Sequence, residues 1–196
     1  MITFAEVEAL AGKLADNMLS DNRPEWLKEM PSASDNTARY YRFFHHLVGR
    51  FGPLRVLEIG TYAGTSACHF ASHNAGGLVR TIDCDPNASR AAERYADRCA
   101  AILDTVTADS IEYVRTTMVH LAPLPFDVLF IDGLHNAAQV SAEYTAYRPF
   151  VLENGLIFFD DINLGDMDDF WRGVTDPKIR LDTLHYTGFG CCRVVP

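Results

Sequence analysis

The chain has 196 residues, of which 48% are hydrophobic and 22% charged, and its formal net charge is −9. This length and composition are typical of one folded domain with a full apolar core. The acidic balance argues against a nucleic-acid surface, which needs clustered Lys and Arg. No apolar run approaches the ~18 residues of a membrane span, and the N-terminus lacks a signal-peptide pattern. Five cysteines form no Cys-x-x-Cys pair, so we expect a cytoplasmic protein with reduced thiols and with neither nucleic-acid nor membrane partners.

The first 52 residues are predicted to form a helical cap. Apolar side chains recur there with the period of a helix, which predicts helices over residues 3–20, 25–30 and 37–50. Ser34 or Asp35 is placed to cap the third helix, and Gly52-Pro53 ends it.

From residue 53 onward, strand-like and helix-like stretches alternate. The expected strands are 54–59, 78–82, 102–107, 126–131 and 155–159. The expected helices between them are 65–74, 87–99, 110–119 and 137–148. Such alternation predicts a doubly wound parallel α/β sheet that is covered by helices on both faces. The tail differs, because residues 182–186 and 190–195, joined through Thr187-Gly188, resemble a hairpin.

The segment 54–66 is the first candidate binding element. A buried strand ends at Gly60, and a helix follows Gly64, which places backbone N–H groups at a helix N-terminus. The two glycines are expected to leave room for a ligand against bare backbone. The third glycine of a dinucleotide fingerprint is absent, so the turn indicates a nucleotide-type ligand of unspecified kind.

Ligands of open parallel sheets bind beyond the carboxyl ends of the strands. Asp83 follows the second strand, 23 residues after Gly60, at a distance typical of a carboxylate that binds a ribose diol. Asp109 follows the third strand. It is placed either to reach the amino group of a base or to cap the next helix.

The fourth and fifth strands end in acids. Asp132 and His135 follow the fourth strand, and Asp160 and Asp161 follow the fifth. A single Asp or His at such a position is most often a turn or cap residue, but all four meet at one edge of the sheet. Three carboxylates there repel one another unless they share a cation, and Mg²⁺ prefers oxygen ligands. The pattern therefore predicts a divalent-metal site at Asp132, Asp160 and Asp161, with His135 as a general base.

These motifs together resemble those of class I S-adenosylmethionine-dependent methyltransferases. The resemblance covers roughly residues 54–195 and rests on Val56–Ser66, Thr81–Pro86, Asp109, Phe126–His135 and Gly155–Asp161. The acids and the histidine are similar to those of the metal-dependent O-methyltransferases of antibiotic biosynthesis that act on macrolide sugars. They are more distantly similar to those of catechol-type enzymes.

The resemblance implies one methyltransferase domain over 1–196, with a cap at 1–52 and a cofactor-binding core at 53–196. It implies a seven-stranded, mostly parallel sheet with an antiparallel last strand. It also implies that S-adenosylmethionine is the cofactor, that Mg²⁺ or another divalent ion assists, and that a small hydroxylated molecule is the substrate. Asp132 and His135 would be catalytic, and the cofactor would contact Glu58, Gly60, Thr61, Tyr62, Gly64, Thr65, Ser66, Asp83 and Asp109.

Two other functions stay open. A non-catalytic cofactor-binding module would keep the glycine turn and Asp83 but would not need the acids after the later strands. A nicotinamide-dependent oxidoreductase would need the missing third glycine. The stretch after the fifth strand is short for a substrate lid, so a homo-oligomer in which a second subunit closes the site is one expectation.

Overall fold

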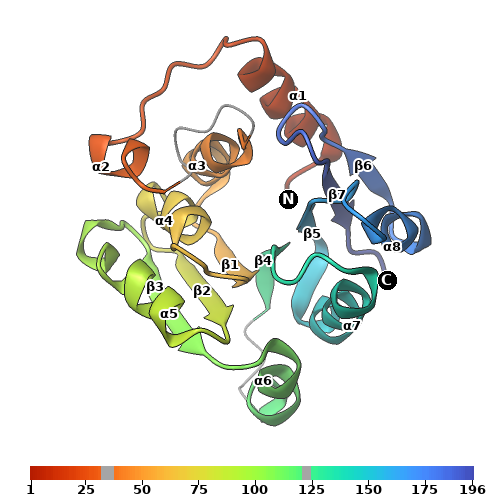
Figure 1. The fold of residues 1–196 in the computed structure, drawn as a ribbon. Helices are drawn as coiled ribbons and strands as arrows, with labels where there is room; N and C mark the ends of the chain where they lie inside the picture. The colour runs from red at the N-terminus through yellow and green to blue at the C-terminus, as the bar shows by residue number, and fades with distance from the viewer. Residues whose placement is uncertain (32–37, 121–124) are drawn as a thin grey trace.

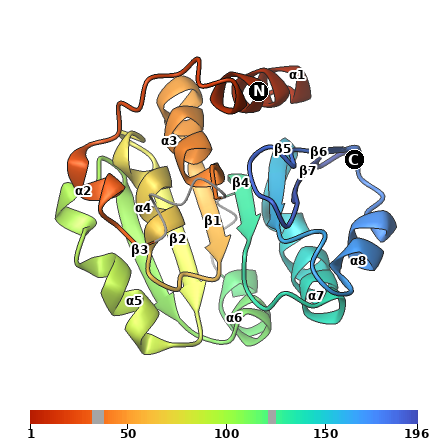
Figure 2. The same ribbon diagram turned by 45° about the horizontal axis from the view of Figure 1, so that its top comes forward.

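A seven-stranded sheet forms the centre of the structure (Figures 1 and 2). The structure is a computed structural model that describes residues 1–31, 38–120 and 125–196. The strand order is β3-β2-β1-β4-β5-β7-β6, and β7 runs antiparallel to both of its neighbours. The predicted doubly wound, mostly parallel sheet is therefore confirmed. Its strands are β1 (Arg55–Ile59), β2 (Leu78–Asp83), β3 (Ile102–Thr107), β4 (Phe126–Ile131), β5 (Val151–Asp160), β6 (Lys178–Arg180) and β7 (Phe189–Arg193).

Helices cover both faces of this sheet. The α-helices are α1 (Phe4–Ala15), α2 (Glu25–Lys28), α3 (Tyr40–Phe51), α4 (Thr65–Ser72), α5 (Pro86–Glu93), α6 (Ser110–Thr116), α7 (Ala137–Tyr147) and α8 (Met167–Gly173). Short 3₁₀ turns follow three of them, at Ala96–Arg98, Met118–His120 and Arg148–Phe150. Because side chains alternate along a strand, Val56 of β1 packs into the apolar cluster of α1, α3 and α4, whereas Leu57 packs into that of α6, α7 and α8.

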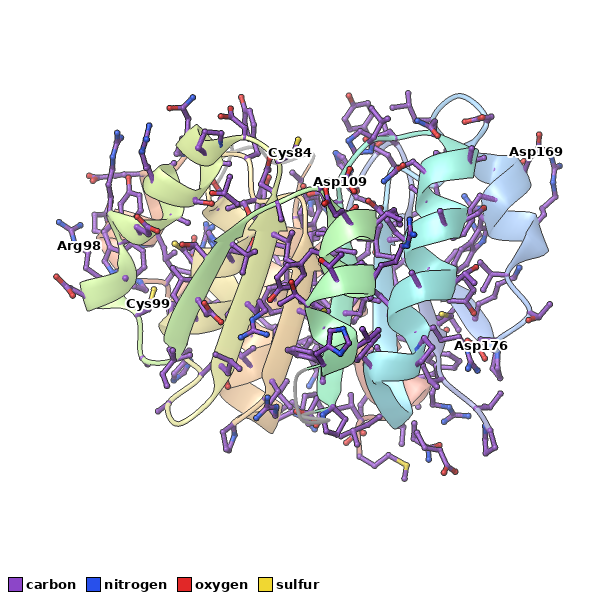
Figure 3. All side chains as sticks on the ribbon, turned by 90° about the horizontal axis from the view of Figure 1, so that it is seen from below. Cys84, Arg98, Cys99, Asp109, Asp169 and Asp176 are labelled. Atoms are coloured by element: carbon purple, nitrogen blue, oxygen red, sulfur yellow. The ribbon has the colours of Figure 1, made fainter. Side chains whose placement is uncertain are left out.

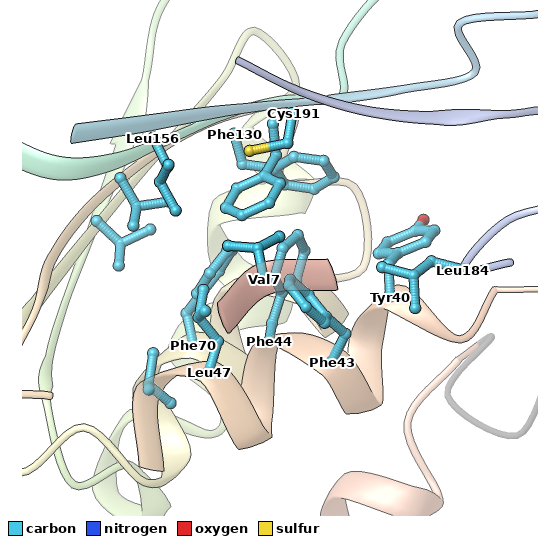
Figure 4. Packing of buried hydrophobic residues seen from close by; sticks show 14 of the residues in the cluster. Val7, Tyr40, Phe43, Phe44, Leu47, Phe70, Phe130, Leu156, Leu184 and Cys191 are labelled. Atoms are coloured by element: carbon cyan, nitrogen blue, oxygen red, sulfur yellow. The ribbon is translucent and has the colours of Figure 1, made fainter. Parts of the chain in front are cut away.

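Helix α3 joins the N-terminal cap to the sheet through aromatic rings (Figure 4). Phe44 stacks on Phe70 of α4 with ring centroids 3.9 Å apart, and its edge meets Phe130 of β4 at 4.9 Å. All three side chains are fully buried. Aromatic side chains of this size contribute much of the stability of a core, so the cap is packed firmly against the strands that carry the site.

Two predicted elements differ in the structure. The first helix ends at Ala15 and not at residue 20, because Asn17 adopts a left-handed backbone conformation (φ 54°). The tail does pair antiparallel, but with Lys178–Arg180 as the first strand. The last hydrogen bond between the two segments runs from the Leu181 N–H to the Phe189 carbonyl at 2.7 Å. Residues 182–186 lie beyond it, in the turn that joins the two strands. The predicted caps Ser34 and Asp35, and the first residue of the 37–50 helix, lie outside the described residues.

Within the described parts of the chain, no helix is both long and apolar enough to cross a membrane.

Candidate active site

The turn after β1 is shaped by close approach of the chain to itself. Gly60 has φ +95°, and a Cβ added there would lie 2.0 Å from the backbone oxygen of Asp132. A Cβ on Gly64 would lie 2.7 Å from Ala92. At both glycines the missing side chain makes room for neighbouring protein, so the expected room for a ligand against bare backbone stays a prediction. Gly60 still lines the cavity described below.

Asp83 holds this turn in place. One carboxylate oxygen accepts hydrogen bonds from the Thr61 and Tyr62 N–H groups, both at 2.9 Å, and the other accepts from the Asp85 N–H at 2.9 Å. The side chain also lines the cavity beside Tyr62. The acid that was predicted from its spacing thus lies at the site and fixes the backbone of the glycine turn.

Asp109 has one of the two roles that the sequence left open, the helix cap, and its place leaves the other role possible as a proposal. Its side chain caps α6 by accepting the Glu112 N–H at 2.8 Å. It also lines the same cavity, together with Cys84 at the end of β2. Figure 3 shows these two residues at the same end of the strands.

Five of the residues predicted to contact a cofactor do not line the cavity, namely Gly64 and the four polar residues that follow. Glu58 is fully buried and accepts a hydrogen bond from the Thr81 hydroxyl at 2.6 Å, and burial raises its pKa to about 7. Thr61 also bonds Thr81, at 2.6 Å between hydroxyl oxygens. The Thr65 hydroxyl donates to the Pro31 carbonyl at 2.8 Å, and Ser66 is buried beside Glu58. These side chains support the turn from below.

One cavity of about 670 Å³ joins the ends of β1, β2, β3, β4 and β5. From the predicted set it is lined by Gly60, Tyr62, Asp83, Asp109, Asp132, His135, Asp160 and Asp161. The cap contributes Tyr40 and Tyr41, which the sequence had left as either an entrance or simple packing. The cavity has the size of a small-molecule site.

The acids after β4 and β5 meet because the two strands are parallel neighbours, with Ile131 paired to Phe159. Asp132 hydrogen-bonds the carboxyl group of Asp160. Burial, together with the charges of Asp160, Glu58 and Asp161, holds the pKa of Asp132 well above its ordinary value. The raised pKa favours the protonated form of Asp132, which is one way in which neighbouring carboxyl groups relieve the repulsion between like charges.

Asp161 is brought to the same place by its backbone. Consecutive residues of a strand point to opposite faces, but Asp161 adopts a left-handed conformation (φ 56°) directly after β5. Its carboxylate then accepts hydrogen bonds from His135 and from the Thr187 hydroxyl. Burial acts to raise the pKa of Asp161, but these bonds outweigh it and the pKa lies below its ordinary value.

His135 lies between two of the acids. Its Nδ1 is 3.0 Å from Asp161 Oδ2, and its Nε2 is 4.0 Å from Asp132 Oδ1. The hydrogen bond to Asp161 raises the pKa of the imidazole, and burial offsets part of that effect. With 35% of its side chain exposed, His135 faces both the acids and the cavity.

His185 is a residue of this site that sequence reasoning missed. Its Nδ1 lies 2.7 Å from Asp160 Oδ1 and 3.5 Å from Asp161 Oδ1. The set of donor atoms that lies within 4.8 Å of one another comprises Asp160, Asp161 and His185, so Asp132 is beside this set and not in it. The sequence placed His185 inside a strand of the tail. Only its position just before the strand that pairs with β5 could have indicated its role.

The sequence comparisons agree with this arrangement. A family model described as "Methyltransferase domain" matches residues 57–162, which is more than half of the chain. The O-methyltransferase ankF from Aspergillus thermomutatus is 28% identical over 138 residues, which cover 68% of this chain and 55% of that protein. The chain spans about half the length of the relatives that it matches.

Solved structures share the fold at low sequence identity. An O-methyltransferase from Bacillus cereus in complex with SAH aligns with a TM-score of 0.66 and 18% identity, over 96% of this chain and 99% of that one. The O-methyltransferase TomG from Streptomyces achromogenes, involved in tomaymycin synthesis and solved with SAM, aligns with a TM-score of 0.66 and 20% identity, over 100% and 92%. The family match spans the glycine turn, Asp83, Asp132 and both acids that end β5, and the chain belongs to the methyltransferase domain family.

Proposed function

We propose that the chain is an S-adenosylmethionine-dependent O-methyltransferase that acts on a small hydroxylated molecule. The observation that carries this proposal is the single cavity that joins Asp83 and Asp109 to Asp132 and His135. A cofactor at the first pair would lie in the same cavity as an acceptor at the second. The matched relatives and the aligned structures are themselves named O-methyltransferases, which supports the proposal.

The residues present fit this cofactor. Its sulfonium and amino groups are positively charged, and the cavity wall carries Asp83, Asp109, Glu143 and the acids after β4 and β5. Lys and Arg do not occur among the described residues that line the cavity. Gly60 would approach the ligand with backbone alone, and Asp83 would accept hydrogen bonds from the ribose hydroxyls on the lone pairs that the turn leaves free.

The acids also fit a divalent cation. Asp132 hydrogen-bonds the carboxyl group of Asp160, and the neighbouring negative charges raise the pKa of Asp132. A bound cation would offset this repulsion between the carboxylates. Asp160 and Asp161, with Asp132 beside them, would hold Mg²⁺ or another divalent ion, and that ion would lower the pKa of a neighbouring hydroxyl group.

His135 would take the proton of the acceptor. If Nδ1–H donates to Asp161, the lone pair of Nε2 faces the cavity and accepts that proton. When bound, S-adenosylmethionine would supply the methyl group to the deprotonated acceptor oxygen, and its sulfur would keep the electron pair of the broken carbon–sulfur bond. The cavity contributes mainly by holding the two reactants in position, an effect worth about 7–11 kcal/mol in well-aligned systems.

Calorimetric titration with S-adenosylmethionine, with and without Mg²⁺, tests the proposal. We expect saturable binding, no comparable binding of NAD, and methyl transfer to some member of a panel of phenols and sugars. Asp132→Asn should remove the stimulation of turnover by Mg²⁺ and change the cofactor Kd less than ~3-fold, whereas the exposed Asp97→Asn should change neither. NAD binding without S-adenosylmethionine binding would contradict the proposal.

A further inference from the structure

We propose that His185 supplies a nitrogen ligand to the ion at Asp160 and Asp161, so that this site prefers Mn²⁺ and later first-row ions to Mg²⁺. The inference rests on the proposed function only for the presence of an ion at this end of the sheet. It concerns which side chains bind the ion and therefore which ion is bound.

The geometry places an imidazole among carboxylates. Nδ1 of His185 and one oxygen from each of Asp160 and Asp161 lie within 4.8 Å of one another, a separation that a single ion can bridge. His185 Nδ1 faces Asp160 at 2.7 Å and Asp161 at 3.5 Å. One imidazole and two carboxylates are a mixed donor set of the kind that divalent transition ions accept.

His185 is held in this orientation from several sides. The edge of the Tyr40 ring meets its imidazole with centroids 5.3 Å apart, and Tyr186 packs against it at 5.1 Å. The Thr187 hydroxyl lies 3.0 Å from Nδ1, and the His185 carbonyl accepts the Gly188 N–H at 3.1 Å. Only 13% of the side chain is exposed. A ligand fixed in this way loses little entropy when the ion binds.

The donor set indicates the class of ion. Mg²⁺ prefers oxygen donors and keeps several waters. The affinity of imidazole for divalent ions rises from Mg²⁺ through Mn²⁺ to Fe²⁺, Co²⁺ and Zn²⁺. The nitrogen of His185 should therefore raise the affinity for these ions without helping Mg²⁺. The expected preference for Mn²⁺ over Mg²⁺ is about 10–100-fold, the range seen when a well-placed group at a metal site is lost or gained.

Electron paramagnetic resonance of Mn²⁺ bound to the full chain tests this assignment directly and needs no turnover. The wild-type protein, stripped with a chelator, should bind one Mn²⁺ and show the ¹⁴N echo modulation of a coordinated imidazole. His185→Asn keeps an amide N–H near the position of Nδ1 but removes the imidazole. It should lose the modulation and bind Mn²⁺ at least ~10-fold more weakly.

Matched variants separate ligation from packing. His135→Gln removes the other imidazole beside Asp161 and should keep the ¹⁴N modulation. His185→Phe keeps a ring against Tyr40, so it provides a second folded protein without the nitrogen if His185→Asn unfolds. Three results would each overturn the inference. They are ¹⁴N modulation that survives in either His185 variant, equal affinities of the wild-type protein for Mn²⁺ and Mg²⁺ in competition, and absence of bound Mn²⁺. If S-adenosylmethionine binding and methyl transfer persist in that event, the proposed function stands without this ligand.

Discussion

Single residues decide the chemistry at this site. Asp160 and Asp161 are adjacent in the sequence, yet both carboxylates reach the same group of side chains because Asp161 leaves the extended conformation (φ 56°). A non-glycine residue in this conformation costs on the order of 1 kcal/mol or more, and Asp and Asn tolerate it best. Substitution by Asn is therefore the suitable probe of the Asp161 charge, since Ala would add backbone strain to the loss of the carboxylate.

At the same scale, His135→Gln is expected to reduce methyl transfer by about 10²–10⁴-fold, the usual contribution of a general base. The glutamine cannot take the acceptor proton, but it keeps a polar group near Asp161. Cofactor affinity, measured by calorimetry, should change less than ~2-fold, because the proposed function places His135 beside the acceptor and not beside the cofactor. The exposed His120 provides the control, and His120→Gln should have full activity. Loss of activity accompanied by an equal loss of cofactor affinity would assign His135 to cofactor binding instead.

Among the elements, the loops that follow β1 and β4 hold each other in place. The space for a side chain at Gly60 is filled by the backbone of Asp132, and the Asp132 N–H donates to the Ile59 carbonyl at 2.9 Å. The turn that we propose to face the cofactor and the loop that carries the proposed catalytic residues Asp132 and His135 therefore pack directly against each other. A substitution in one of these loops should therefore also shift the other loop.

Gly60→Ala tests this coupling. The added methyl group would lie 2.0 Å from the Asp132 oxygen, and φ +95° disfavours any side chain. We expect a loss on the order of 3 kcal/mol in the free energy of unfolding. Gly12→Ala is the matched control, because Gly12 is an exposed residue within α1 and a Cβ there meets nothing within 4 Å. This change should stabilise the protein by about 0.5–1 kcal/mol. Equal unfolding midpoints for the two variants in urea would refute the argument.

The segment between α1 and α2 contacts α4 through His69, a buried histidine of α4. His69 Nδ1–H donates to the Thr65 carbonyl at 2.7 Å, which leaves Nε2 to accept from Arg23 at 3.0 Å. Burial lowers the pKa of His69 to about 3, and the charge of Arg23 acts in the same direction. The contact therefore depends on a neutral imidazole.

This contact predicts a pH-dependent stability. The pKa of His69 is about 3 in the folded protein and 6.5 in the unfolded chain, so the unfolded state binds the proton first. Stability should therefore fall as the pH drops through the window from 6.5 towards 3, by about 3 kcal/mol between pH 6.5 and pH 4. His69→Gln should be less stable than wild type at pH 7. Its free energy of unfolding should not show the fall of about 3 kcal/mol between pH 6.5 and pH 4 that the titration of His69 causes. Urea unfolding at pH 4, 5 and 7 measures both, and parallel curves for the two proteins would contradict the assignment.

For the whole molecule, most of the sheet was predictable because apolar, β-branched runs alternate with amphipathic helices from residue 54 to residue 159. β6 was not predictable, because Lys178–Arg180 is three residues long and partly exposed and carries no apolar alternation. Asp132, Asp160 and Asp161 could be found because each lies at the carboxyl end of a buried strand or directly after it. His185 could not, because its place beside Asp160 depends on how β7 folds back on β5.

The cap and the core share one apolar cluster, and we propose that they unfold together. Phe44 of the cap contacts Phe70 and Phe130, both in the core. The two tryptophans report on separate regions, since Trp26 stacks on Tyr95 at 5.6 Å and Trp171 packs near Phe159 at 6.0 Å. Trp26→Phe leaves Trp171 as the only tryptophan, and Trp171→Phe leaves Trp26. Urea unfolding followed by tryptophan fluorescence should give the same midpoint for the two variants. Phe44→Ala should lower the free energy of unfolding by about 3–5 kcal/mol for both probes. An earlier transition of Trp26 alone would show that residues 1–52 form a separate cooperative unit.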